Sequence, residues 1–181
     1  KPGSRLIKVM TVAFGQSKLL REPVAGLMHF FIFWGFVVLL TAIAESIAEG
    51  IIPGFTLSAI GTTPYGVLAF LQDLLVGLVI IAVFVALFRR YVLRPKRLDL
   101  GIHSKLDAMA ILMSILLIVV SMLGQNAARL VLGESESSTR FLSALAMPLF
   151  SAMESSSVVT WFEIFWWTHI VLVLAFLNYL P

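Results

Sequence analysis

The 181-residue chain contains no cysteine and few charged residues. Without cysteine it can form no disulfide, no thiolate-bound zinc site and no cysteine-ligated iron–sulfur cluster of its own. Charged residues make up 13% of the chain, against about 25% in soluble domains. Hydrophobic residues make up 60%, against about half in soluble domains. A single core of this size cannot hide so much apolar surface from water. The composition therefore excludes disordered and collagen-like chains and argues against a water-soluble globule.

Four apolar stretches are long enough to cross a bilayer. A membrane helix needs roughly 20 mainly apolar residues, because it rises about 1.5 Å per residue through a hydrocarbon core of about 30 Å. The predicted spans cover residues 24–44, 65–88, 106–128 and 158–180. The sequence thus predicts an all-α integral membrane bundle of four transmembrane helices over residues 23–181, with residues 1–22 as a separate segment.

The segment 1–22 and the connection 129–157 differ from the spans. Residues 1–22 mix apolar side chains such as Leu6, Val9 and Phe14 with lysine and arginine, which is typical of an amphipathic helix lying at the inner interface. In the connection, the apolar stretch 141–150 is too short to cross, and we expect it at the outer surface. The chain begins at Lys1 without a signal peptide, and we interpret it as a segment of a longer protein.

Lysine and arginine are distributed very unequally between the two sides of the predicted bundle. Arg129 and Arg140 are on one side, and the other side has the remaining eleven: Lys1, Arg5, Lys8, Lys18, Arg21, Arg89, Arg90, Arg94, Lys96, Arg97 and Lys105. Short loops rich in these residues stay in the cytoplasm. We therefore expect a multi-pass protein of the cell inner (cytoplasmic) membrane, with both ends of the segment cytoplasmic. Anionic headgroups account for the same charge, so no nucleic acid partner is expected.

Two histidines lie within the predicted spans, where ionisable side chains usually face the bundle interior or a cavity. His29 lies about 9 Å from the cytoplasmic end of the first span. Gly26 and Gly35 would let a flat ring approach this helix, and the aromatic residues between them would pack against it. Histidine nitrogen is an axial ligand of haem iron, and the alternative is a hydrogen-bonded packing histidine.

The second histidine, His169, lies deeper, about 18 Å from the cytoplasmic end of the fourth span. Trp166 and Trp167 precede it and suit packing around a buried ring, although a packing role is again the alternative. Two ligands of one haem iron must lie at nearly the same depth. The two histidines therefore belong to different haem levels, or one of them is not a ligand. His103, just outside the third span, is on the correct side to pair with His29, but a loop histidine is more often solvated.

One acidic residue, Asp73, lies within the second span. It makes either a helix–helix hydrogen bond or a contact to quinone or a proton pathway. We assign no role to Asp107 and Glu163, which are close enough to helix ends to be solvated. The sequence contains no phosphate-binding loop, nucleophile elbow or zinc-protease motif, so this segment has no complete catalytic site and its status as an enzyme stays open.

Four stretches together resemble a known membrane domain. They are LREPVAGLMHFFIFWGF at 20–36, FLQDL at 70–74, YVLRPK at 91–96, and WWTHI at 166–170 followed by AFL at 175–177. Their order and spacing resemble the membrane domain of heterodisulfide-reductase-related membrane-bound iron–sulfur oxidoreductases. That domain is similar to the nitrate reductase gamma subunit, a b-type cytochrome. The resemblance covers all four spans.

The resemblance implies a larger redox protein. Such proteins have one further span before this segment, giving five, and a cytoplasmic domain after it that carries iron–sulfur clusters. Electrons pass between a soluble donor, in some members electron-transferring flavoprotein, and membrane quinone. The resemblance implies haem b with His29 and His169 as iron ligands, and a partner for His29 beyond Pro181. The gamma subunit has two histidines on its matching helix where this chain has only His29, so we expect one haem and leave a second open.

The function that follows is a membrane domain relaying electrons through b-type haem between a cytoplasmic iron–sulfur or flavoprotein donor and the quinone pool. The alternative is a haem-free membrane anchor for the cytoplasmic iron–sulfur domain, which a purely aliphatic environment around the histidines would favour. A small transporter is a third interpretation. Broken helices at mid-depth would support it, and the spans contain only single glycines.

Overall fold

The computed structural model describes residues 2–16, 19–52, 54–94, 102–135 and 138–179. Within these ranges the chain is helical and has no strand, which confirms the predicted all-α class. Some residues used above for orientation and for the end of the fourth span lie outside the described residues: Lys1, Lys18, Lys96, Arg97, Leu180 and Pro181.

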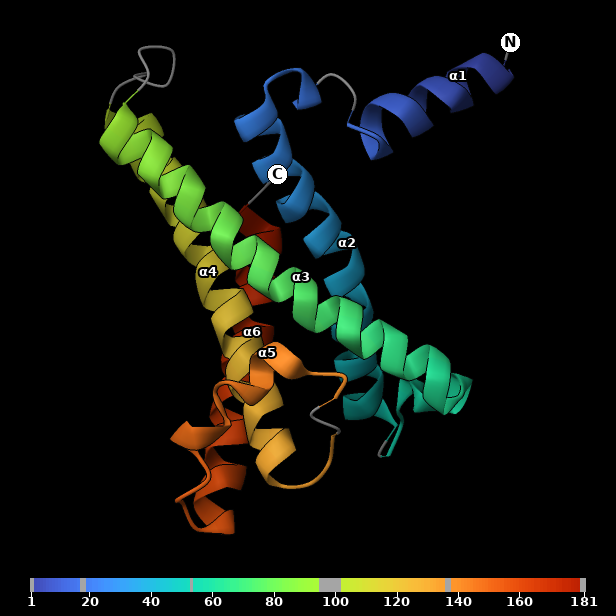
Figure 1. Cartoon of the computed structure of the whole chain (residues 1–181), viewed down its shortest axis with the longest axis vertical. Coiled ribbons are helices and arrows are strands. Elements are labelled where there is room, and N and C mark those ends of the chain that lie inside the picture. Colours follow the sequence, from blue (N-terminus) through green and yellow to red (C-terminus); the bar gives the residue numbers. More distant parts are fainter. Residues whose placement is uncertain (1, 17–18, 53, 95–101, 136–137, 180–181) are drawn as a thin grey trace.

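Four long helices dominate the structure (Figure 1). They are α2 (Pro23–Ile51), α3 (Thr62–Phe88), α4 (Ile102–Val131) and α6 (Ser155–Tyr179). Each is long and apolar enough to cross a membrane, which confirms the four spans. All four extend at least three residues beyond the predicted apolar stretches at one end, and α3 continues into the π-helical turn η4 (Arg89–Leu93). Helix ends outside the hydrocarbon core can include polar residues because headgroups and water satisfy them.

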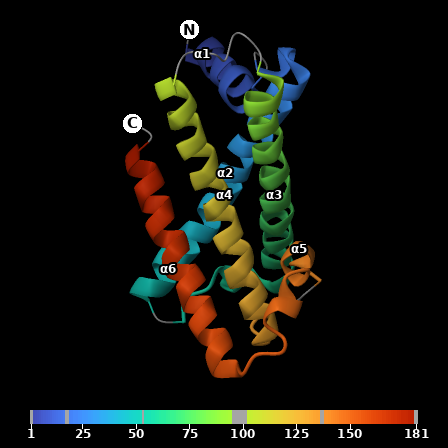
Figure 2. The same cartoon turned by 90° about the vertical axis from the view of Figure 1, so that its left-hand side faces the viewer.

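The four helices alternate in direction, so the chain begins and ends on the same side of the bundle (Figure 2). This side, here called the terminal end, also has η4 and the first turn of α4. The opposite side, the far end, has the short elements η3 (Leu57–Ile60), α5 (Phe141–Ala144) and η6 (Met147–Leu149). The described basic residues that the sequence placed on one side lie at the terminal end, and Arg129 and Arg140 lie towards the far end.

The long helices pack as two pairs. Helix α2 lies along α3, and α4 lies along α6, while α3 also contacts α4. Close approach within each pair depends on glycine: Gly35 of α2 faces the side chain of Val79 on α3, and a Cβ at Gly124 of α4 would lie 2.7 Å from the ring of Phe165 on α6. Among the described residues, α2 makes only sparse close contacts with α4 and α6. The two pairs therefore leave space between them.

The N-terminal segment forms α1 (Pro2–Val9), the π-helical turn η1 (Met10–Phe14) and the short 3₁₀ helix η2 (Leu19–Arg21). Helix α1 lies apart from the four long helices (Figure 1). The ring of Phe14 contacts α2, with its centroid 6.4 Å from those of Phe33 and Trp34. Leu6 and Ile7 are 64% and 65% exposed. The segment is helical as predicted, and its location at the membrane interface stays a prediction.

The far-end connection does not cross the bundle, but it is not a surface layer either. Helix α5 packs against α3 and α4, and a Cβ at Gly77 of α3 would lie 2.7 Å from the side chain of Leu142. Ser143 and Phe150 are buried. The stretch 141–150 lies at the far end without crossing the bundle, as expected, and it folds back so that these two side chains are buried. Its place on the outer side of the membrane stays a prediction.

We predict that Gly124→Val lowers the stability of the bundle by about 1–3 kcal/mol, the usual effect of overpacking. The new side chain would have to displace Phe165 or separate α4 from α6. Thermal unfolding in detergent, followed by circular dichroism, measures the change. The control is Gly50→Val, the same change at a helical glycine whose Cβ would meet no atom within 4 Å. Equal melting temperatures for the two variants would contradict the packing described here.

Candidate functional site

Two adjoining cavities lie where the helix pairs separate. The first, at the terminal end, has a volume of about 540 Å³, and the second, deeper in the bundle, has a volume of about 390 Å³. We call them the polar cavity and the apolar cavity. His29, Ile111 and Leu112 line both, so the cavities meet at the level of His29. Their volumes are in the range of small-molecule sites, about 300–1,000 Å³.

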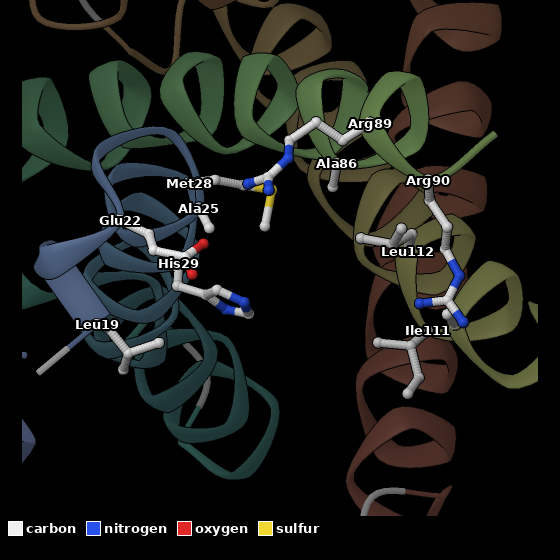
Figure 3. Close-up of a pocket in the computed structure, with 11 residues that line it drawn as sticks. Leu19, Glu22, Ala25, Met28, His29, Ala86, Arg89, Arg90, Ile111 and Leu112 are labelled. Atoms are coloured by element: carbon white, nitrogen blue, oxygen red, sulfur yellow. The ribbon is translucent and has the colours of Figure 1, made fainter. Parts of the chain in front are cut away.

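The polar cavity brings charged side chains from two helices to His29. Arg89 and Arg90 are the first two residues of η4, which continues α3, and Glu22 immediately precedes α2. Figure 3 shows Glu22 and His29 together on the α2 side, with Arg89 reaching towards them from α3. Arg90 lies on the opposite wall beside Ile111. The remaining lining residues are Leu19, Ala25, Met28, Ala86, Ala108 and Leu112.

The apolar cavity contains one histidine from each helix pair. His29 belongs to α2 and His169 to α6, and both line this cavity. The other lining residues are aliphatic, phenylalanine or methionine: Ile32, Phe33, Phe36, Leu39, Ile43, Val79, Ile111, Leu112, Ile115, Ile118, Val119, Met122, Val173, Phe176 and Leu177. The histidines are thus its only polar side chains; His169 is buried, whereas His29 is exposed.

His169 is fixed by hydrogen bonds on one side of its ring. The side chain is 4% exposed, and its Nδ1 lies 3.0 Å from the carbonyl oxygen of Ile118 and 3.2 Å from Oγ of Ser121. The Ser121 hydroxyl donates to the same carbonyl, at 2.8 Å. When Nδ1–H donates to a carbonyl, Nε2 keeps its lone pair for a ligand. Histidines that bind metals are held in this way.

His29 has no comparable restraint. Its imidazole makes no hydrogen bond or ion pair within the described part of the chain. The ring opens on both cavities. Both of its nitrogens are therefore available to a molecule bound between the helix pairs.

Helix α4 shows how far apart in depth the two histidines lie. His29 shares its cavity walls with Ile111 and Leu112, whereas His169 contacts Ile118 and Ser121. These offsets of six to ten residues correspond to about 9–15 Å along the helix, so the two rings lie at different depths, as expected from the sequence. The two rings share a cavity but lie at different levels of it, which is not the arrangement of two ligands on one iron.

The structure does not bring His103 to the other histidines. It lies in the first turn of α4, is exposed and lines neither cavity. Nothing in its surroundings places it opposite His29.

Several residues expected to surround a ring have other neighbours. The space beside Gly26 is filled by the backbone of Leu19, and that beside Gly35 by Val79. The expectation that these glycines admit a planar ligand is therefore wrong. Trp166 and Trp167 pack edge to face on each other at 4.9 Å, and neither lines the polar or the apolar cavity, so their role around a bound ring stays a prediction.

The sequence alone does not identify the charged residues of the polar cavity as parts of a binding site. In the sequence, Arg89 and Arg90 indicate membrane orientation as part of a cationic loop, and Glu22 belongs to the motif at 20–36 without a role of its own. A tandem arginine directly after an apolar span could have indicated the site. It shows that two cations sit at the edge of the hydrocarbon core, though not which cavity they face.

Asp73 has a structural role at the far end. It is fully buried, and its carboxylate accepts hydrogen bonds from the backbone N–H of Leu142 at 2.5 Å, and from the N–H and hydroxyl of Ser143 at 3.2 and 2.5 Å. It thereby caps α5 and ties it to α3. Asp73 lines neither cavity, and these contacts favour the hydrogen-bond interpretation over a quinone or proton role.

The described residues include no cluster of three or more histidine, cysteine, aspartate or glutamate side chains that could hold a metal ion. The cavity offers single imidazole ligands instead. Such a ligand set suits a metal that brings most of its ligands with it, as iron does in a porphyrin.

Comparison with known proteins gives two curated relatives. The chain is 31% identical over 179 residues to the probable iron–sulfur-binding oxidoreductase FadF of Bacillus subtilis (strain 168), covering 98% of this chain and 24% of that protein. It is 27% identical over 188 residues to EtfAB:quinone oxidoreductase of Syntrophomonas wolfei subsp. wolfei (strain DSM 2245B / Goettingen), covering 100% of this chain and 26% of that protein. Both relatives are oxidoreductases.

The similarity extends over nearly all of this chain, so it includes all four spans. The chain nevertheless spans only about a quarter of the length of these relatives. No protein-family model and no solved structure matches it. The relatives agree with the iron–sulfur oxidoreductase part of the resemblance, and the similarity to the nitrate reductase gamma subunit stays a prediction.

We predict that Asp73→Ala destabilises the far end by several kcal/mol, because it leaves buried donors without an acceptor at about 1–3 kcal/mol each. Limited proteolysis of the connection 129–157 and the thermal midpoint measure the loss. Glu163→Ala removes an exposed carboxylate of α6 and is the control. Unchanged stability of Asp73→Ala combined with loss of quinone reduction would contradict the capping role and support a quinone or proton role.

Proposed function

We propose that this chain is a membrane electron-transfer domain that relays electrons through b-type haem between a cytoplasmic iron–sulfur or flavoprotein donor and the quinone pool. The observation that carries the proposal is the cavity between the helix pairs, to which α2 and α6 each contribute one histidine. The relatives support its redox part, since one is named an iron–sulfur-binding oxidoreductase and the other a quinone oxidoreductase.

The cavity residues fit a haem. Porphyrin binding requires an apolar space, a nitrogen ligand and room for a charged edge. The apolar cavity supplies the first, and His29 and His169 supply the second. The polar cavity lies on the terminal-end side of His29 with two arginines in its wall. The hydrogen bond from His169 Nδ1 to Ile118 fixes one imidazole in a ligand-ready tautomer.

Haem, when bound, supplies one-electron redox chemistry. The residues of this chain would hold it and set its potential. His29 is the proposed iron ligand at the level nearer the terminal end, and His169 is the proposed ligand at the deeper level. The difference in depth supports two separate levels, so one haem at His29 is the minimal arrangement and a second at His169 is the extended one. The aliphatic walls exclude water, and the cations at the terminal end favour the reduced state electrostatically.

The distribution of charge indicates from which side of the membrane the electron donor would approach the bundle. Basic loops remain on the cytoplasmic side, so the terminal end faces the cytoplasm of a cell bounded by this membrane. An iron–sulfur domain of the same protein would meet the bundle there. A flavoprotein donor is supported by the EtfAB named in one relative, and quinone would approach within the lipid.

A haem-free membrane anchor is the second candidate function. Most residues that line the apolar cavity are aliphatic, among them Ile32, Ile115, Val119 and Val173. Such a lining is also compatible with a bundle whose cavity holds lipid tails, and whose only task is to hold a redox domain at the membrane.

The test is a reduced-minus-oxidised visible spectrum of the detergent-purified full-length protein, together with a pyridine haemochrome count. We predict a b-type α band that His29→Ala weakens or abolishes, since it removes the proposed ligand. His103→Ala is the matched control, because His103 is exposed and lines neither cavity, and it should keep the band. A count of two haems, one of them lost in His169→Ala, would support the extended arrangement.

The opposite result is equally specific. Absence of any α band in protein produced with a sufficient haem supply would contradict the relay. The anchor would then be the function that the cavity supports.

A further inference from the structure

Arg89 and Arg90 have donor groups that the protein leaves unused. Both side chains are half-buried at the start of η4, directly after α3. The Arg89 guanidinium makes no hydrogen bond or ion pair with any described residue. Arg90 donates through one Nη to the carbonyl and hydroxyl oxygens of Ser104, at 2.6 and 3.1 Å, while its buried Nε has no partner. Half-buried cations with unused donors indicate room for an anion, because desolvated charge is costly without a partner.

The position of these arginines limits what the anion can be. They line the polar cavity, which adjoins the apolar cavity at His29. Figure 3 shows Arg89 reaching across from α3 towards the side of the cavity formed by His29 and Met28. A molecule that fills both cavities would therefore have an apolar body and an acidic edge, with the acidic edge at the terminal end.

We infer that Arg89 and Arg90 bind the two carboxylates of the haem whose iron His29 ligates, and so determine which edge of the porphyrin faces the terminal end. This inference rests on the proposed function. The planar guanidinium fork of arginine matches a carboxylate and can bind it through two parallel hydrogen bonds. With His29 on α2 and the arginines on η4, the continuation of α3, one bound molecule would be held from both members of the helix pair.

An anionic lipid is another source of the same chemistry. A phosphate headgroup could occupy the polar cavity while its acyl chains occupy the apolar one, since basic pockets between membrane helices bind such lipids. The distinguishing property is esterification, because haem dimethyl ester keeps the iron and the ring but lacks both negative charges.

The experiment is a titration of haem and of haem dimethyl ester into full-length protein produced without haem. It compares wild type with Arg89→Gln, Arg90→Gln, Arg90→Lys and Arg21→Gln. Arg21 is a matched control, because it is exposed at the same end and lines neither cavity. Arg90 also donates hydrogen bonds to Ser104. Arg90→Lys keeps the positive charge at this position and therefore separates loss of charge from loss of the guanidinium group. Circular dichroism confirms that each variant is folded.

We expect Arg89→Gln to weaken haem binding about tenfold or more, the value of one lost charge-assisted hydrogen bond. Arg21→Gln should bind as wild type does, and Arg90→Lys should retain more affinity than Arg90→Gln. The dimethyl ester should bind wild type more weakly than haem does. It should show no further loss in Arg89→Gln, because the arginine no longer has a carboxylate to bind.

Two results would overturn the inference while the proposed function stands. One is haem binding that Arg89→Gln leaves unchanged. The other is an equal loss for haem and its ester in that variant, together with loss of co-purified lipid phosphorus, which would assign the arginines to a lipid. Wild-type protein that binds neither haem nor its ester would instead contradict the proposed function itself.

Discussion

Lack of water in the hydrocarbon core is the constraint on which this structure depends. A polar side chain there must find a partner in the protein or in a ligand. Most buried polar residues have such a partner. Asp73 binds the start of α5, and Gln72 donates to Thr41 on α2. The exposed His29 and the half-buried Arg89 differ, because they line the cavities without a hydrogen-bonding partner among the described residues. Their position marks the part of the bundle that is adapted to something other than the chain itself.

Helix pairing produces that space. Glycine allows close approach of α2 to α3 and of α4 to α6, and nothing similar draws α2 onto α4 or α6. In lipid there is no hydrophobic driving force to close such a gap, because the acyl chains are as apolar as the side chains. A gap between two well-packed pairs is therefore stable only when lipid or a ligand fills it, which makes the two histidines on its walls the natural focus for function.

The sequence predicts the spans and the two cavity histidines well, because hydropathy and ionisable residues in apolar segments are strong signals. It predicts helix pairing poorly, since helices that are apolar on every side show no preferred face. For this reason the sequence suggests a ligand beside Gly26 and Gly35, whereas in the structure they contact Leu19 and Val79. Arg89 likewise indicates the orientation of the chain in the membrane from the sequence alone, whereas its place in a cavity depends on tertiary packing.

A relay and an anchor differ most directly in where iron lies. The decisive measurement is the position of iron in the full-length protein, located by anomalous scattering at the iron absorption edge. The account predicts an iron site between α2 and α4, beside His29 and within the helical bundle. Iron found only in clusters outside the four membrane helices, in protein produced with sufficient haem, would contradict it.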